Sequence, residues 1–326
     1  MTIEDIRAAA ARLAGHAVQT PLLSSPFLDQ LAGRRVLVKA EPLQETGSFK
    51  FRGAWSAMTA LSDEARQRGV IAFSSGNHAQ GVARAAQMLR VPAVIVMPAD
   101  APKLKVSNTM AYGAEVVLYD RVSESREEIG AKLAQERGLS LIKPFDDPQV
   151  IAGQGTIGLE LAEQAKAAGV ESADVLIPAS GGGLASGVAL ALESAAPRLR
   201  VRTAEPVGFD DFARSLTAGE RLRNPAMDGS IQDAIMSPIP GELTFPILSR
   251  LAGPGLTVSD DEALHAMAVS MIRLKLVAEP GGAAGLAAAL FRKDEIEGDA
   301  VIVVVSGGNA DPERMSEALT RFGNLV

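Results

Sequence analysis

Short apolar runs alternate along the chain with longer Ala- and Leu-rich segments. Several short runs are continuously apolar, which predicts strands covered on both faces. The predicted strands are 35–41, 69–75, 92–98, 115–120, 173–180, 200–206 and 300–306. Segments such as 80–90 and 156–169 have helical spacing. This alternation predicts an α/β fold with open, mostly parallel sheets flanked by helices.

The opening and the middle of the chain carry further boundary signals. Thr2 and Asp5 fit a capping box that begins an Ala-rich helix. Residues 221–246 have weak periodicity and several prolines, and predict an irregular connection. The best candidate for a domain break is 144–148, where prolines flank a polar turn before a long helix. A length of 326 residues suits two lobes of ordinary size.

Composition excludes several classes of function. With 47% hydrophobic and 22% charged residues, we expect a folded globular protein rather than a disordered one. The net charge of −7 argues against a broad nucleic-acid surface. The chain has no cysteine and three histidines, which excludes thiolate chemistry and leaves little room for a His-rich metal site. We expect neither a signal peptide nor a membrane span, and therefore a cytoplasmic location.

A lysine in an apolar setting is the first candidate for chemistry. Lys50 stands between Phe49 and Phe51 in GSFKFRGA, 47–54. Desolvation lowers the pKa of a lysine and favours the neutral amine that attacks carbonyl groups. A surface lysine on an amphipathic helix is the alternative.

Three further Gly- or Ser-rich segments follow predicted strands, where ligands collect in α/β folds. SSGNHAQG, 74–81, offers backbone N–H groups to an anion, although a plain capped turn is the alternative. ASGGGLASG, 179–187, predicts a phosphate-binding loop. The same glycines could be taken for a dinucleotide-binding motif. That motif needs an acidic residue at the end of the next strand to hold the ribose, and no clear one is present, although Glu205 is a candidate. Ser306, after the most apolar strand, offers a hydroxyl to a ring nitrogen or begins a turn.

Taken together, these segments resemble a known family. In the order found in the threonine dehydratase and serine racemase family, the chain carries SFKFRGA, SSGNHAQG, PFDDPQVIAGQGTIGLE, ASGGGLASG, EPGGAAG and VVSGGN. The resemblance covers nearly the whole chain. It implies a two-domain fold type II (tryptophan-synthase-β-like) enzyme that uses pyridoxal 5′-phosphate (PLP). Residues 1–52 and 148–326 would form a large PLP-binding domain, and 53–147 a small domain that gates the substrate.

The resemblance also implies roles for single residues. Lys50 would hold PLP as a Schiff base and move the Cα proton, and Ser75 would be a second acid/base on the opposite face. Asn77 would contact the PLP 3′-oxygen, and Ser306 the pyridine nitrogen. The phosphate would be bound by Ser180, Gly181, Gly182, Gly183 and Leu184. The substrate carboxylate would be bound by the turn of Ser74, Ser75, Gly76, Asn77 and His78.

A divalent cation is implied at TAEPVGFDD, 203–211. Glu205 and Asp211 would be ligands, with the Phe209 carbonyl between them. Oxygen-only ligation suits Mg²⁺ or Ca²⁺, with Mn²⁺ as a further option. A solvated acidic turn is the alternative for this segment.

The expected reaction is α,β-elimination. A neutral serine opposite the pyridine nitrogen makes a weaker electron sink than a carboxylate would, which suits loss of a β-leaving group better than transamination. We expect dehydration and deamination of a 3-hydroxy amino acid, with 3-hydroxyaspartate favoured and iminosuccinate, then oxaloacetate, and ammonia as products. The alternatives are a threonine/serine dehydratase and a serine/aspartate-type racemase. A non-catalytic binding protein is the rival of another class, and Lys50 argues against it.

The identity of the substrate is the least determined point. Gln232-Asp233-Ala234 replaces the family's Ala-Asp-Gly. Arg52 and Lys143 are candidate cations for a second substrate carboxylate, and the alternative is that both are surface residues. We expect a homodimer that acts on a small amino acid, without a nucleic-acid or membrane partner.

Overall fold

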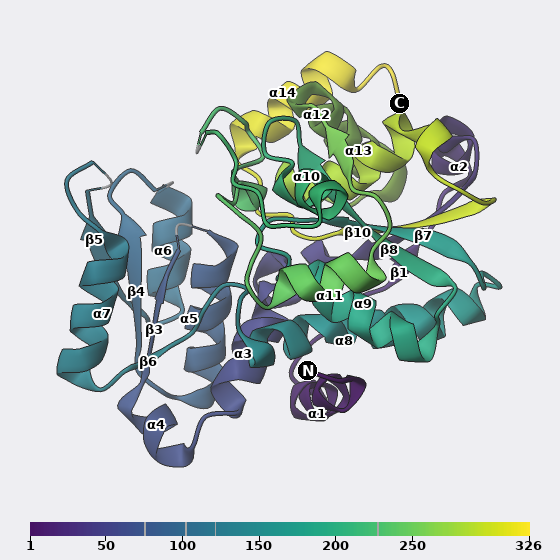
Figure 1. The fold of residues 1–326 in the computed structure, drawn as a ribbon. Helices are drawn as coiled ribbons and strands as arrows, with labels where there is room; N and C mark the ends of the chain where they lie inside the picture. The colour runs from purple at the N-terminus through teal and green to yellow at the C-terminus, as the bar shows by residue number, and fades with distance from the viewer. Residues whose placement is uncertain (75, 102, 121, 227) are drawn as a thin grey trace.

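The computed structural model describes residues 1–74, 76–101, 103–120, 122–226 and 228–326. These residues form two separate sheets, each flanked by helices (Figure 1). The larger sheet has the order β1-β2-β10-β7-β8-β9 and is parallel except at β1. Its strands are β1 (Leu22–Leu23), β2 (Arg35–Ala40), β7 (Ala173–Pro178), β8 (Leu199–Pro206), β9 (Leu256–Val258) and β10 (Ala300–Val305).

The smaller sheet is wholly parallel and has the order β5-β4-β3-β6. It is built from a continuous middle part of the chain and lies on the left of Figure 1. Its strands are β3 (Val70–Phe73), β4 (Ala93–Pro98), β5 (Glu115–Tyr119) and β6 (Ser140–Leu141). The chain therefore begins the larger sheet, crosses to the smaller one and returns at β7.

Helices cover both sheets. Their bounds are α1 (Ile3–Leu13), α2 (Pro26–Ala32), α3 (Lys50–Thr59), α4 (Asp63–Arg68), α5 (Asn77–Leu89), α6 (Lys103–Ala111), α7 (Arg126–Arg137), α8 (Pro148–Ala167), α9 (Gly183–Ala195), α10 (Asp211–Ala218), α11 (Thr244–Leu251), α12 (Asp260–Val269), α13 (Ala284–Phe291) and α14 (Pro312–Phe322). The capping box of Thr2 and Asp5 is formed at α1. In the described part of the chain, no helix combines the length and apolarity needed to cross a membrane.

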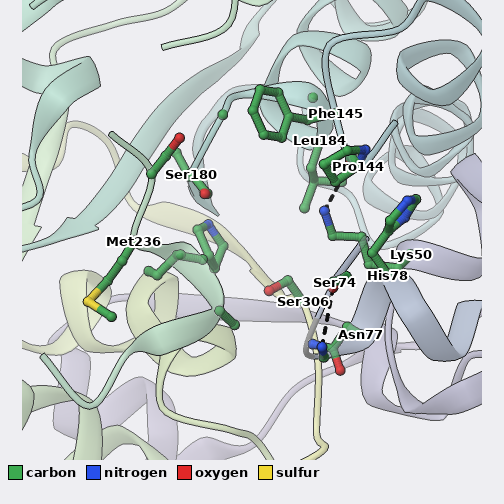
Figure 2. Close-up of a pocket in the computed structure, with 18 of the residues that line it drawn as sticks. Lys50, Ser74, Asn77, His78, Pro144, Phe145, Ser180, Leu184, Met236 and Ser306 are labelled. Carbon is green, nitrogen blue, oxygen red and sulfur yellow. Dashed lines mark hydrogen bonds between the residues drawn. The ribbon is translucent and has the colours of Figure 1, made fainter. Parts of the chain in front are cut away.

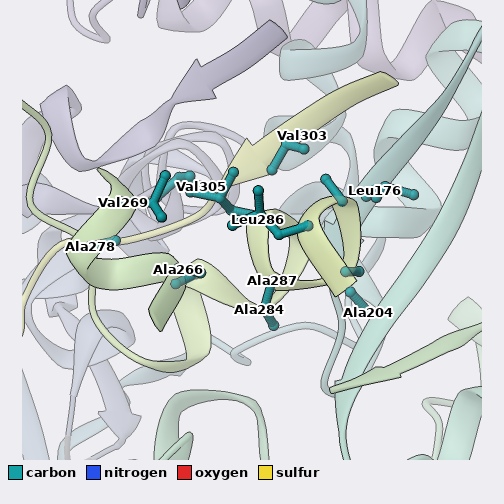
Figure 3. Close-up of a cluster of buried hydrophobic side chains, with 14 of the residues drawn as sticks. Leu176, Ala204, Ala266, Val269, Ala278, Ala284, Leu286, Ala287, Val303 and Val305 are labelled. Atoms are coloured by element: carbon teal, nitrogen blue, oxygen red, sulfur yellow. The ribbon is translucent and has the colours of Figure 1, made fainter. Parts of the chain in front are cut away.

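The larger sheet has an apolar cluster on each face. On one face, Leu176, Val303 and Val305 of the strands pack against Leu286 and Ala287 of α13 (Figure 3). Burial of such aliphatic side chains contributes about 1.5–3 kcal/mol each for the larger ones. The strands are thereby fixed in place, and so are the loops that leave their carboxyl ends.

The α/β fold with mostly parallel sheets is confirmed. Each of the seven predicted strands is present with ends within two residues of those expected. The long helix after 144–148 begins at Pro148, because the Asp147 carboxylate accepts hydrogen bonds from the N–H groups of Gln149 and Val150. The strands β1, β6 and β9 were not predicted, because they are too short to display a period-2 pattern.

Candidate active site

A cavity of about 230 Å³ opens where strands of both sheets end. Ser74 follows β3, Ala179 follows β7 and Ser306 follows β10, and all three line it. This is the edge at which ligands of parallel α/β folds are bound. The residues predicted to hold PLP or the substrate α-carboxylate all line this cavity, apart from Ser75, which lies outside the described residues. Figure 2 labels ten of the lining residues, among them Lys50, Asn77, Ser180 and Ser306, around one shared space.

Lys50 is the first residue of α3. Its Nζ donates a hydrogen bond of 2.9 Å to the Pro144 carbonyl and lies 5.0 Å from the centre of the Phe49 ring (Figure 2). Within the described residues no carboxylate forms an ion pair with it. Burial lowers the pKa of Lys50 to about 8, and the charge of nearby Glu279 opposes this shift. The structure thus gives Lys50 a setting suited to a base near neutral pH rather than that of a surface lysine.

The start of α3 is anchored by buried charges. The Arg52 guanidinium donates to both carboxylate oxygens of Glu41 at 2.9 Å and to Glu160. Lys39 is also fully buried and pairs with Glu160. Arg52 is therefore committed to this cluster and does not line the cavity, and Lys143 is exposed and does not line it either. The suggestion that these two cations receive a second substrate carboxylate is not supported.

Asn77, the first residue of α5, is held from two sides. Its Nδ2 donates to Glu279 Oε1 at 2.5 Å, and its Oδ1 accepts from Asn309 Nδ2 at 2.7 Å. Glu279 is buried, lines the cavity and has its pKa raised by burial. No role was predicted for Glu279, although EPGGAAG was among the shared segments. These contacts fix the orientation of the Asn77 amide.

His78 is buried beside Lys50. Its Nε2 lies 2.9 Å from the Ile142 carbonyl, which can only accept, so the ring proton is on Nε2. Burial and the charge of Lys50 lower the pKa of His78 to about 3. His78 is therefore neutral in the physiological range and adds no positive charge to the cavity.

The glycine loop, from Ser180 to Gly183, connects β7 to α9 and is closely packed. Gly182 has φ +88°, and a Cβ there would lie 2.3 Å from the Phe212 ring. Thr244 Oγ1 donates to the Gly181 carbonyl at 2.6 Å. The loop leads into the N-terminus of a 13-residue helix, whose first N–H groups have no helical acceptor and attract an anion.

Ser306 is joined to the segment that carries the lysine. Its carbonyl accepts from Phe49 N at 3.1 Å, and Ser48 forms an isolated bridge with Gly307. Its hydroxyl points into the cavity (Figure 2). Lys50 and Ser306, far apart in sequence, are consequently held in a fixed relation.

Four further residues line the cavity, and none of them was assigned a role from the sequence. Gln154 of α8 is fully buried, and neither of its amide atoms has a partner within the described residues. Lys105, Arg126 and Asp233 bring charge to the cavity. They stand in separate segments of the chain, so only the fold brings them together.

Glu205 and Asp211 do not line this cavity and are fully buried, which contradicts a solvated turn. Glu205 accepts hydrogen bonds from the N–H groups of Phe212 and Ala213 at 2.8 and 2.9 Å. Asp211 Oδ1 accepts from Asn224 at 2.7 Å, while its Oδ2 is buried and has no partner among the described residues. Burial raises the pKa of Asp211 to about 7 and that of Glu205 well above its usual value.

Comparison with known proteins decides the family. The family model described as pyridoxal-phosphate dependent enzyme matches residues 13–308. The chain belongs to this family of enzymes. Its cofactor is therefore PLP, and the predicted family is confirmed.

Individual relatives cover nearly the whole chain. It is 43% identical over 322 residues to an L-threo-3-hydroxyaspartate ammonia-lyase of Saccharomyces cerevisiae, across 98% of this chain and 96% of the relative. The match to the protein of that name from a Pseudomonas species is 44% over 318 residues, across 97% of each. Among solved structures, a T.th. threonine deaminase has a TM-score of 0.90 and 47% identity, covering 95% of this chain and 99% of that one. A serine racemase from Dictyostelium discoideum has a TM-score of 0.88 and 38% identity, covering the same shares. The fold type II architecture is confirmed.

Proposed function

We propose that this enzyme is an ammonia-lyase that dehydrates and deaminates a 3-hydroxy amino acid, with 3-hydroxyaspartate as its preferred substrate. The observation that carries the proposal is the buried Lys50, whose pKa is lowered to about 8, facing an anion-ready glycine loop across one cavity. Two relatives above 40% identity bear the name L-threo-3-hydroxyaspartate ammonia-lyase, which supports this choice of substrate.

The residues around the cavity fit PLP. The loop from Ser180 to Leu184 would hold the phosphate at the start of α9, where the glycines leave the backbone N–H groups uncovered. Asn77 would contact the 3′-oxygen and Ser306 the ring nitrogen. Gln154 is buried without partners in the described chain, which is unfavourable unless a ligand contacts its amide.

When bound, PLP supplies an electron sink for the negative charge that develops at the substrate Cα. Lys50 takes the Cα proton, and its pKa of about 8 makes it an effective base near neutral pH. Ser74, Gly76, Asn77 and His78 hold the α-carboxylate. Ser306 is a neutral partner, which favours loss of the β-hydroxyl over transamination.

The overall reaction balances without an oxidant or reductant. Loss of water from 3-hydroxyaspartate gives an enamine that tautomerises to iminosuccinate, and hydrolysis of iminosuccinate gives oxaloacetate and ammonia. Ser75 keeps its proposed role as an acid/base on the opposite face, which a racemase would require. Threonine or serine dehydration and racemisation are therefore the alternatives for the test.

The test compares threonine, serine and both 3-hydroxyaspartate diastereomers, with ammonia release and chirality measured side by side. We expect the largest kcat/KM for one 3-hydroxyaspartate diastereomer. Lys50→Ala should abolish turnover and the visible absorbance of bound cofactor, whereas Lys143→Ala, at an exposed lysine, should retain both. Racemisation without ammonia would overturn the proposal, as would full activity in Lys50→Ala.

We also propose a divalent cation, with Mg²⁺ first and Ca²⁺ or Mn²⁺ as options, bound by Glu205, Asp211 and the Phe209 carbonyl. The partnerless Asp211 Oδ2 and the buried carboxylate pair support it. In the described part of the chain no group of three acidic or His side chains gathers, so carbonyl and water oxygens would complete the shell.

The pH dependence of metal binding tests this site. Because the pKa of Asp211 is about 7, Mg²⁺ should raise Tm more at pH 8 than at pH 6. Asp211→Asn should lose this effect and Glu220→Gln, an exposed control, should keep it. An Mg²⁺ effect that persists in Asp211→Asn would exclude this site.

Domain division, assembly and location stay proposals. The four-stranded sheet falls within 53–147, which supports a small gating domain there and a large domain from 1–52 and 148–326. A homodimer and a cytoplasmic location are proposed from the resemblance and the sequence. Sedimentation at several concentrations tests the dimer.

A further inference from the structure

One cation of the cavity has no role in the proposed elimination. Lys105 lies on α6, lines the cavity and is 8% exposed. Its Nζ is 3.8 Å from Asp233 Oδ2, and within the described residues the ammonium makes no hydrogen bond. The buried Glu279 also attracts this charge electrostatically, but an ammonium without a hydrogen-bonded partner among the described residues retains unused donor capacity.

The other positive groups of the cavity are already engaged. Lys50 is the base. Arg126 is half exposed, lies over the Phe73 ring and pairs with Glu127 at 2.8 Å. His78 is neutral. Lys105 is therefore the buried cation that remains for an anionic group of the substrate.

The position of Lys105 suits the far end of a small substrate. Helix α6 is tied to α5 by a hydrogen bond of 3.3 Å from Asn108 to Gln80. Helix α5 begins at Asn77, in the turn proposed to hold the α-carboxylate. Asp233 belongs to the Gln232-Asp233-Ala234 segment, which differs from the family pattern and lies on the side of the larger sheet. Lys105 therefore lines the same cavity as this turn, on a helix that is bonded to α5.

We propose that Lys105 binds the second carboxylate of a dicarboxylic 3-hydroxy amino acid and so sets the preference for 3-hydroxyaspartate over serine and threonine. The inference rests on the proposed function and names the residue that gives it its specificity. The substrate carboxylate replaces Asp233 as the partner of Lys105, in a desolvated position where a charge-assisted hydrogen bond is strong. Serine and threonine have no group to offer there.

The experiment measures kcat/KM for 3-hydroxyaspartate and for serine in wild type and four variants. In Lys105→Gln the ratio of the two values should fall at least 30-fold, mainly through KM for 3-hydroxyaspartate. Lys105→Arg should stay within about fivefold of the wild-type ratio, since it restores the charge. Lys103→Gln, on the same helix but outside the cavity lining, should leave the ratio unchanged. If Lys105→Gln does not fold, Lys105→Met replaces it, because methionine keeps the apolar part of the side chain. The ratio of the two kcat/KM values should then fall in the same way.

Each contrary outcome has its own meaning. A parallel loss for both substrates in Lys105→Gln would assign Lys105 a structural role and overturn the inference. A ratio that survives Lys105→Gln but collapses in Arg126→Gln, the fourth variant, would assign the second carboxylate to Arg126. A wild-type protein that deaminates serine or threonine but neither 3-hydroxyaspartate diastereomer would overturn the proposed function, and the inference with it.

Discussion

The two sides of the cavity are built by different means. On the side proposed for the cofactor, backbone segments approach so closely that only glycine fits, and the buried Arg52 is paired at short range with Glu41. On the side proposed for the distal end of the substrate, Lys105 and Asp233 face each other at 3.8 Å and Asp233 is largely exposed. Close packing suits the cofactor side, because its chemistry is common to the family. The loosely paired Lys105 and Asp233 suit the substrate side, where a change of side chain can change the preferred substrate.

The close packing of the cofactor side is visible at α3. A Cβ on Gly153 of α8 would lie 2.4 Å from the Arg52 carbonyl, and a Cβ on Gly81 of α5 would lie 3.1 Å from the Lys50 carbonyl carbon. Helices α5 and α8 therefore hold the backbone of Lys50 between them. The ion pairs of Arg52 with Glu41 and Glu160 also anchor the first turn of α3.

The largest effect on this side is expected from Arg52→Met. The substitution leaves Glu41 buried without its partner, and loss of one member of a buried pair typically costs about 3–5 kcal/mol. Urea unfolding should show a loss of this size, together with weaker PLP binding because α3 carries Lys50. Arg137→Met, which removes an exposed pair with Glu115, should barely change stability. Equal effects of the two substitutions would mean that the buried cluster does not anchor the site.

An intermediate effect is expected at the glycine loop, where the chain offers a matched pair. Gly182 and Gly208 both have positive φ, at +88° and +85°, but an added Cβ meets the Phe212 ring only at Gly182 and has open space at Gly208. Both alanine variants carry backbone strain, of about 1–2 kcal/mol. Gly182→Ala adds overpacking of about 1–3 kcal/mol and displaces the loop.

PLP titration, followed by absorbance, separates the two variants. Gly182→Ala should weaken PLP binding at least tenfold, and Gly208→Ala should leave it unchanged. If both variants bind PLP like wild type, the loop does not hold the phosphate.

The difference between the two sides also explains what the sequence could predict. Strands such as β4, β7 and β10 could be predicted because both of their faces are buried, whereas the edge strand β5 is only partly buried. The cofactor side could be predicted because Lys50, the glycine loop and Ser306 each belong to a continuous motif. Arg52 was misjudged because a lysine or arginine beside aromatics looks the same in sequence whether it reaches a cavity or a buried pair of glutamates.

The substrate side could not be read in this way. Lys105 follows a strand by several residues in a helix of weak amphipathic pattern, and Asp233 lies in an irregular connection far along the chain. Their approach depends on how the two sheets stand relative to each other, which no local pattern encodes. Gln154 was part of a quoted motif, but its unpartnered amide becomes evident only with the packing of α8.

The smallest effect is expected from Asp233→Asn, which tests the substrate side directly. An exposed carboxylate 3.8 Å from Lys105 contributes little to stability, so Tm should stay close to that of wild type. The same carboxylate competes with a substrate carboxylate for Lys105 and repels it. A unit charge at about 4 Å in water is worth about 1 kcal/mol, or roughly fivefold in binding. The KM for 3-hydroxyaspartate should therefore fall two- to fivefold while KM for serine stays constant, and Asp228→Asn, an exposed control, should change neither. A rise in KM for 3-hydroxyaspartate would show instead that Asp233 is needed to orient Lys105, and that this side of the cavity is as firmly built as the other.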